Sequence, residues 1–175
     1  MKILLATDGS PDATDAVEWL EHLPLPEDTC VEVVSVMPYP TPTEAAVALA
    51  WSEVRAESER VVDEAVRRVA KRWPAVMGGV LAGAEPRVAI VEAAAATDAD
   101  LIVVGARGLG GGASLLLGSV SLGVTRNAPC PVLVCKGAPR PLRAVTLALD
   151  GAPPTRAPPR TSSAVSPCRR TWRRA

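Results

Sequence analysis

Short apolar runs alternate with longer amphipathic segments over residues 1–135 of the chain. The apolar runs predict strands at about 3–6, 30–36, 80–82, 101–104 and 132–135. Between them, apolar residues recur at helical spacing and predict helices at about 11–23, 43–73, 86–97 and 119–127. Strands that alternate with helices in this way are typical of βαβ units, so the sequence predicts an α/β fold built on a parallel sheet.

Turn and capping residues mark the ends of these helices. The sequence Asp-Gly-Ser-Pro at residues 8–11 supplies a turn, a helix N-cap and a proline at the first helical position. Prolines at positions 24 and 26 end the first helix, and Pro74 ends the second. The second helix is expected to start near Thr43 and to face the core with Val47, Ala50, Val54, Val61, Ala65 and Val69.

The segment from Leu101 to Ser121 is the most informative part of the sequence. An apolar run ends at Gly105, a glycine-rich loop follows, and Gly118-Ser119 opens a predicted helix. Glycines let the backbone approach a ligand closely, and a helix start offers free N–H groups at the positive end of the helix dipole. A flexible connector would also be rich in glycine, but the helix start that follows favours a phosphate-binding loop.

Gly105, Gly108, Gly118 and Ser119 fit the pattern G-x2-G-x9-G-S. This pattern is the nucleotide signature of the ATP-binding branch of the universal stress protein family, and the order of predicted elements from Met1 to about residue 137 also resembles that family. The resemblance implies a five-stranded parallel sheet of order 3-2-1-4-5, with helices on both faces. In this order, the second and third strands lie on one side of the first strand and the fourth and fifth on the other. α/β sheets bind ligands at such a switch point, here between the first and fourth strands, beyond the carboxyl ends of the strands.

The two loops at this predicted crevice are residues 6–9 and the loop that begins at Gly105. The resemblance implies that the Gly105 loop and the following helix start wrap the triphosphate and ribose of ATP, with hydroxyl donors from Ser119 and Ser121. Asp8 is expected near the ribose, the phosphates or Mg2+, an ion that takes most of its other ligands from phosphates and water. The expected nucleotide-binding residues are Ala6, Thr7, Asp8, Val36, Gly105, Ala106, Arg107, Gly108, Leu109, Gly110, Gly111, Gly118, Ser119, Val120 and Ser121.

Four of these residues also have plainer interpretations. Asp8 could serve only as a turn residue. Ala6 and Val36, which the family places against adenine through backbone groups, could be ordinary core residues. Arg107 could pair with phosphate or be an exposed loop arginine without a role, and the sequence leaves both open.

Other kinds of site find little support in the sequence. The four cysteines form no CxxC pair and His22 is the only histidine, so no zinc site is predicted. No Ser/His/Asp set, Cys/His set or P-loop is present, so no catalytic residue is assigned and at most weak ATP hydrolysis is expected. No apolar run reaches the roughly 18 residues of a membrane span and no secretory signal is evident, which predicts a cytoplasmic protein without membrane partners.

The C-terminal part of the chain differs sharply in charge. Residues 1–139 contain 11 Lys and Arg against 18 Asp and Glu, whereas residues 140–175 contain eight Arg and one Asp. The basic segment lacks interleaved aromatic residues apart from Trp172, which argues against nucleic-acid binding. We therefore expect a universal stress protein domain at 1–137, then at 138–175 a partial second copy and a disordered tail rich in Ala, Pro and Arg. The second copy is indicated by a match, at an offset of 142, of Leu5, Ala6, Asp8, Gly9 and Pro11 to Leu147, Ala148, Asp150, Gly151 and Pro153.

The sequence and the resemblance together predict an ATP-binding regulator or signalling module of the stress response, with ATP and Mg2+ as cofactors. One alternative is a slow ATPase or nucleotide-transfer enzyme at the same site, and another is an interaction protein that binds no nucleotide. The apolar strand at 132–135 is an edge in the expected order, and an exposed edge must be covered or paired. Family members pair this strand across a two-fold axis, so a homodimer is expected.

Overall fold

The structure, a computed structural model, describes residues 1–37, 45–109, 117–141, 143 and 146. The described residues form a parallel sheet of order β3-β2-β1-β4-β5, with helices between the strands. This arrangement confirms the predicted fold class. The elements are β1 (Lys2–Ala6), α1 (Pro11–His22), β2 (Cys30–Met37), α2 (Ala45–Val69), β3 (Val76–Ala82), α3 (Pro86–Ala96), β4 (Leu101–Gly105), α4 (Ser119–Asn127) and β5 (Val132–Cys135).

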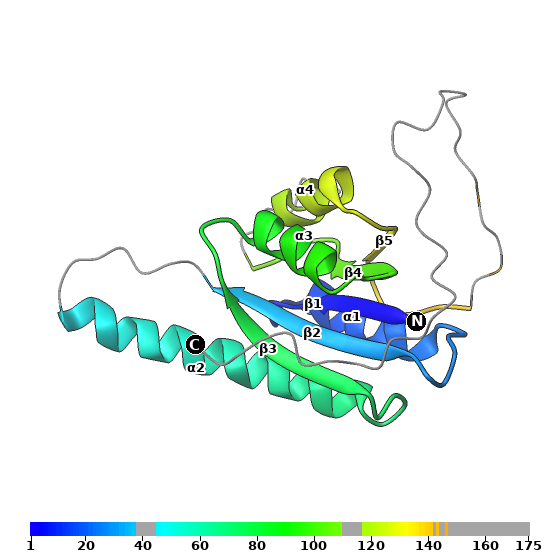
Figure 1. Ribbon diagram of the computed structural model, residues 1–175, viewed down its shortest axis with the longest axis horizontal. Coiled ribbons are helices and arrows are strands. Elements are labelled where there is room, and N and C mark those ends of the chain that lie inside the picture. Colours follow the sequence, from blue (N-terminus) through cyan, green and yellow to red (C-terminus); the bar gives the residue numbers. More distant parts are fainter. Residues whose placement is uncertain (38–44, 110–116, 142, 144–145, 147–175) are drawn as a thin grey trace.

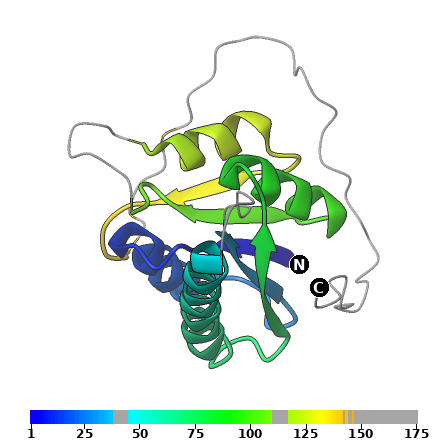
Figure 2. The same ribbon diagram turned by 90° about the vertical axis from the view of Figure 1, so that its left-hand side faces the viewer.

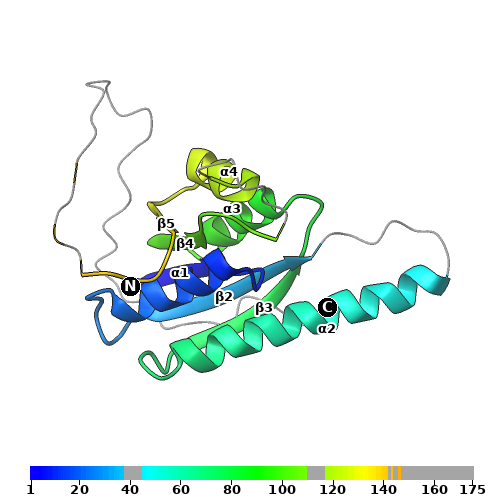
Figure 3. The ribbon, with the colours of Figure 1, turned by 180° about the vertical axis from the view of Figure 1, so that it is seen from behind.

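The sheet lies between two layers of helices. Figure 2 shows α3 and α4 on one side of the strands and α1 and α2 on the other. Seen from behind in Figure 3, α1 lies over the centre of the sheet, and α2 runs along β2 and β3. The N-terminal half of α2 extends past the carboxyl ends of the strands (Figure 1).

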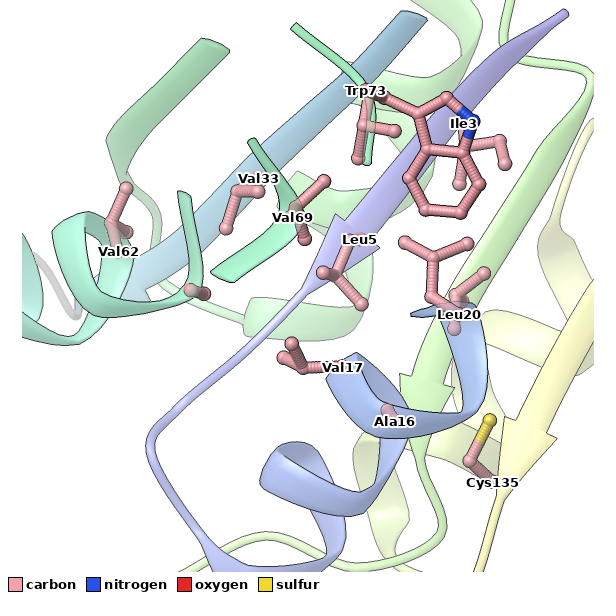
Figure 4. Close-up of a cluster of buried hydrophobic side chains, with 13 residues drawn as sticks. Ile3, Leu5, Ala16, Val17, Leu20, Val33, Val62, Val69, Trp73 and Cys135 are labelled. Atoms are coloured by element: carbon pink, nitrogen blue, oxygen red, sulfur yellow. The ribbon is translucent and has the colours of Figure 1, made fainter. Parts of the chain in front are cut away.

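Each face of the sheet has its own hydrophobic core. On the α1–α2 face, Leu5, Leu20 and Trp73 are fully buried (Figure 4). The indole N–H of Trp73 donates to the Pro26 carbonyl at 3.0 Å, so the polar edge of the ring is satisfied. Cys135 borders this core, and its burial raises the pKa of the thiol to about 12. On the α3–α4 face the buried residues are Leu4, Ala6, Val34, Leu81, Ile90, Ala93, Ala94, Ile102, Val104 and Val124.

The structure corrects the prediction for the second helix. α2 ends at Val69, and Trp73 follows it in a non-helical segment. Val54 is 43% exposed rather than part of the core, because this stretch of α2 lies beyond the sheet and has no strand beneath it (Figure 1). Ala65 and Val69 are buried as expected. Position 43 and the side chains at 47 and 50 lie outside the described part of the chain.

Candidate functional site

The carboxyl ends of β1 and β4 lie side by side in the sheet. Ala6 pairs with Val104 in β4 and with Val34 in β2, and the Thr7 N–H donates to the Val34 carbonyl at 2.9 Å. The β1–α1 turn and the Gly105 loop therefore leave the sheet from neighbouring strands and lead to helices on opposite faces. This is the crevice at which the strand order reverses, where α/β sheets bind ligands.

The β1–α1 turn is built by its own side chains. Gly9 has φ +75°, a left-handed conformation that favours glycine. Oδ1 of Asp8 accepts the Ser10 N–H at 3.0 Å, a local bond typical of aspartate in turns. Ser10 then caps α1, because its hydroxyl oxygen accepts the Ala13 N–H at 3.3 Å. The expectation that Ser10 is a helix cap is confirmed.

Three polar contacts join this turn and the start of α1 to the Gly105 loop. Oδ2 of Asp8 accepts the Leu109 N–H at 3.1 Å, and the Ser10 hydroxyl donates to the Arg107 carbonyl at 3.2 Å. Nε of Arg107 donates to Oδ2 of Asp12 at 3.2 Å, in an ion pair whose side chains are 30% and 15% exposed. These contacts hold the two loops in a fixed relation to each other.

Glycine at positions 105 and 108 allows the loops to approach so closely. A Cβ on Gly105 would lie 2.6 Å from backbone atoms of Asp12 and Ala13, so the start of α1 packs directly on the end of β4. A Cβ on Gly108 would collide with Oδ2 of Asp8, the atom that receives the Leu109 N–H. Glycine at 105 is therefore required by backbone contacts, whereas a Cβ at 108 would displace the Asp8 carboxylate from its contact with the Leu109 N–H.

The helix that follows the Gly105 loop begins without a side-chain cap. The N-cap of α4 is Gly118, and no acidic residue stands in its first turn. Within the described ranges, the N–H groups of Ser119, Val120 and Ser121 have no protein acceptor, as is usual for the first turn of a helix. By contrast, α1 has a Ser10 cap and Asp12 in its first turn. Of the two helix starts at the crevice, α4 is the one whose positive end remains available to an anion.

Ser121 anchors α4 against the Gly105 loop. Its hydroxyl is buried and donates to the Ala106 carbonyl at 2.7 Å, and the same carbonyl accepts the Gly118 N–H at 2.7 Å. The hydroxyl of Ser121 therefore positions the helix start, whereas Ser119 is exposed beside it.

The remaining expected residues differ in their setting. Ala6 is buried in the α3–α4 core and Val36 packs against it, so their side chains serve the core. Gly110 and Gly111 lie outside the described residues. Sequence reasoning missed Asp12, because an acidic residue in the first turn of a helix is common and carries no signal of a partner 95 positions away.

Two other features of the described residues bear on function. A cavity of about 120 Å³ opens on the α1–α2 face, beside the β1–α1 turn, and is lined in part by Thr7 and Gly9 of that turn and by Thr14, Arg60 and Arg68. This is well below the roughly 300–1,000 Å³ of ordinary ligand pockets, so the cavity is too small for a nucleotide.

Among the described residues, no group of three or more His, Cys, Asp or Glu could hold a metal ion. None of the helices in the described part of the chain is long and apolar enough to span a bilayer.

The sequence model of the universal stress protein family matches residues 1–136. The chain belongs to the universal stress protein family. It is 34% identical over 139 residues to universal stress protein MJ0531 of Methanocaldococcus jannaschii, a match that covers 77% of this chain and 81% of that relative. It is 29% identical over 175 residues to universal stress protein Rv1996 of Mycobacterium tuberculosis, covering 86% of this chain. The chain spans about half the length of that relative, 54%.

Solved structures share the fold of this universal stress protein. Hypothetical protein MJ0577 gives a TM-score of 0.71 at 24% identity, covering 78% of this chain and 95% of that one. A universal stress protein solved in complex with cAMP gives 0.61 at 24% identity, covering 78% and 97%. A family member from Arabidopsis thaliana solved with AMP bound gives 0.57 at 18% identity, covering 77% and 90%. At these identities the likeness is one of fold.

Proposed function

We propose that this universal stress protein binds ATP together with Mg2+ in the crevice between the β1–α1 turn and the Gly105 loop, and acts as a nucleotide-dependent regulator or signalling module of the stress response. The observation that carries the proposal is the uncapped start of α4 at Gly118. Its first N–H groups, which have no acceptor among the described residues, come at the end of the glycine-rich loop, beside the central strands of the sheet. Backbone donors at a helix N-terminus are well suited to phosphate because they combine hydrogen bonds with the helix dipole.

The conformation of Gly118 supports a role for this residue towards a ligand rather than within the protein. Its φ is −72°, which any residue adopts, and a Cβ there would make only ordinary 3.4 Å contacts with Ala106 and Arg107. The fold therefore does not require glycine at this position. Close approach of a phosphate to the backbone would require it.

The charges at the crevice favour nucleotide bound with a cation. Asp8 and Asp12 face the loop with two carboxylates, and Arg107 supplies one positive charge. Mg2+ fits this setting, because it binds through phosphate oxygens and water with one or two protein carboxylates. Asp8 is the exposed carboxylate at the edge of the crevice and would be its protein ligand, while the ion itself would neutralise part of the phosphate charge.

The family relatives agree with an adenine nucleotide as the ligand. Two solved proteins of the same fold carry cAMP and AMP. Both ligands contain adenosine and phosphate, as ATP does. The fit of ATP to this chain rests on the loop, the α4 start and the family signature rather than on those ligands.

Calorimetric titration of the purified protein with ATP and Mg2+ tests the proposal. We expect saturable binding of ATP. Turnover of ATP, measured beside an Asp8→Ala variant, separates a binding protein from a slow ATPase, because Asp8 is the exposed carboxylate at the crevice. Turnover that depends on Asp8 would favour the enzyme, and the absence of ATP binding would favour an interaction protein that uses no nucleotide.

The finer organisation of the chain is also a proposal. β5 forms an edge of the sheet, and Val132, Leu133 and Val134 are only partly buried there, which favours pairing with a second molecule of this protein across this edge.

For the segment 138–175, we propose a partial second copy of the domain sequence followed by a disordered tail. The match to Rv1996 supports the second copy, because it covers 86% of this chain and so extends past the family domain at 1–136.

One experiment tests both parts of this organisation. We expect light scattering to give the mass of a dimer for the full chain and for a chain ending at residue 150. We also expect their melting temperatures to agree within about 3 °C, since changes away from the core usually alter stability by about 0.5 kcal/mol or less. A monomeric full chain would contradict the β5 interface. A large loss of stability in the shortened chain would show that the tail packs on the domain.

A further inference from the structure

The Arg107–Asp12 ion pair lies where the starts of α1 and α4 meet the Gly105 loop. Asp12 belongs to the first turn of α1, and Nε of Arg107 donates to its Oδ2 at 3.2 Å. On the other side, a Cβ on Gly118 would lie 3.4 Å from Cα of Arg107. Arg107 is thus adjacent to the start of α4, the expected phosphate site, while its charge is directed at Asp12.

This arrangement offsets part of the positive charge of Arg107. The Asp12 side chain is only 15% exposed and that of Arg107 30%, so solvent screens the pair less than it would at an open surface. The other carboxylate at the crevice, Asp8, is held by the Ser10 and Leu109 N–H groups. A nucleotide that approaches α4 therefore meets backbone donors and an arginine whose Nε is already paired with a carboxylate.

We propose that Asp12 is a specificity-determining residue of the nucleotide site: by offsetting the charge of Arg107, it weakens binding of metal-free, highly charged nucleotides and makes ATP binding depend on Mg2+. The inference rests on the proposed nucleotide site. Without a cation, ATP carries about four negative charges and AMP about two. When the charge of Arg107 is offset, the affinity for the triphosphate therefore falls more than the affinity for the monophosphate. Mg2+ supplies the missing positive charge, so the penalty falls mainly on ATP without metal.

Asp12→Asn is the variant that tests this proposal. It removes one negative charge and keeps the size of the side chain, so Arg107 becomes available to phosphate. Calorimetric titrations with ATP in EDTA, ATP with Mg2+, and AMP in EDTA give the three affinities needed. We expect Asp12→Asn to tighten ATP binding in EDTA by about fivefold or more, and to change the other two affinities by about twofold or less. The gain in EDTA should shrink as salt is added.

Two further variants assign the effect to charge on Arg107. Asp12→Glu keeps the carboxylate and should behave as the wild type. In an Arg107→Gln background, Asp12→Asn should give a much smaller gain for ATP in EDTA, because contacting residues act non-additively. Far-ultraviolet circular dichroism of each variant checks that the helices are intact.

The outcomes separate this inference from the proposed function. Equal gains for ATP and AMP, weaker ATP binding by Asp12→Asn, or an undiminished gain in the Arg107→Gln background would each overturn the role of Asp12 while leaving the nucleotide site in place. If neither ATP nor AMP binds the wild type or Asp12→Asn under any of these conditions, the proposed function fails and this inference fails with it.

Discussion

Among glycine-to-alanine substitutions at the crevice, Gly105→Ala is expected to cause the largest loss of stability. The new Cβ would lie 2.6 Å from the Ala13 nitrogen and from the carbonyl carbon and oxygen of Asp12. These are backbone atoms, so no side-chain rotation relieves the contact, and α1 must move away from β4. We expect a loss of about 2–3 kcal/mol in the free energy of unfolding, at the upper end of the range typical of overpacked cores, and a fall in melting temperature of about 10 °C.

Gly79→Ala is the matched control for this prediction. A Cβ on Gly79, in β3, meets no atom within 4 Å. The same chemical change should therefore shift the free energy of unfolding by about 0.5 kcal/mol or less, measured by urea denaturation of both variants. Equal stabilities of the two variants would mean that α1 and β4 do not pack as closely as described.

Gly118→Val is expected to have the largest effect on ATP binding while leaving the fold intact. Within the protein, a Cβ at this position makes only ordinary contacts, and the extended backbone at the helix N-cap accepts a β-branched residue. A bound phosphate would instead meet the added methyl groups where it approaches the backbone. We expect ATP affinity to fall at least about tenfold, equivalent to about 1.4 kcal/mol, in calorimetric titrations with Mg2+.

The comparison of stability with affinity makes this prediction specific. Gly118→Val should melt within about 5 °C of the wild type, since valine is a poorer helix N-cap than glycine by about 1 kcal/mol or less. Gly79→Ala should bind ATP as the wild type does. Unchanged ATP affinity in a folded Gly118→Val protein would place the phosphates somewhere other than the α4 start.

Much of the fold could be predicted because local and tertiary signals agree. The apolar runs at β1 and β4 are buried on both faces of a parallel sheet, so they stand out as continuous hydrophobic segments. The Ser10 cap and Pro11 mark the start of α1 at the residue where it begins. The strand order came from the family resemblance, because periodicity alone does not say which strands are neighbours.

β3 was predicted too short, and its glycines explain why. It begins at Val76, earlier than expected, and contains Gly78 and Gly79, which have low strand propensity. A Cβ on Gly78 would lie 2.5 Å from Cγ1 of Val62 and 2.7 Å from Cγ2 of Val66. Glycine at position 78 therefore allows α2 to pack closely on the sheet. Because this contact comes from a helix elsewhere in the sequence, the residues around β3 give no sign of it.

The candidate site also has a part that could be predicted from local sequence and a part that could not. The glycine signature indicated the Gly105 loop and the α4 start, because the spacing of its residues reflects a local geometry. The network that fixes this geometry was not predictable, since Asp8 and Asp12 meet Leu109 and Arg107 only through the topology of the sheet. Ser121 was expected as a hydroxyl donor to the nucleotide, and the structure uses its hydroxyl within the protein.

The central claim is that the start of α4 and the Gly105 loop hold the phosphates of ATP, and amide chemical shifts test it most directly. In a titration of isotope-labelled protein with ATP and Mg2+, we expect the largest shifts at the backbone amides of Gly108, Ser119 and Val120. The amides of Gly79 and Gly137, outside the crevice, should stay in place. Shifts centred instead on Thr14, Arg60 and Arg68, or no shift at Ser119 and Val120 in the presence of saturating ATP, would contradict the account.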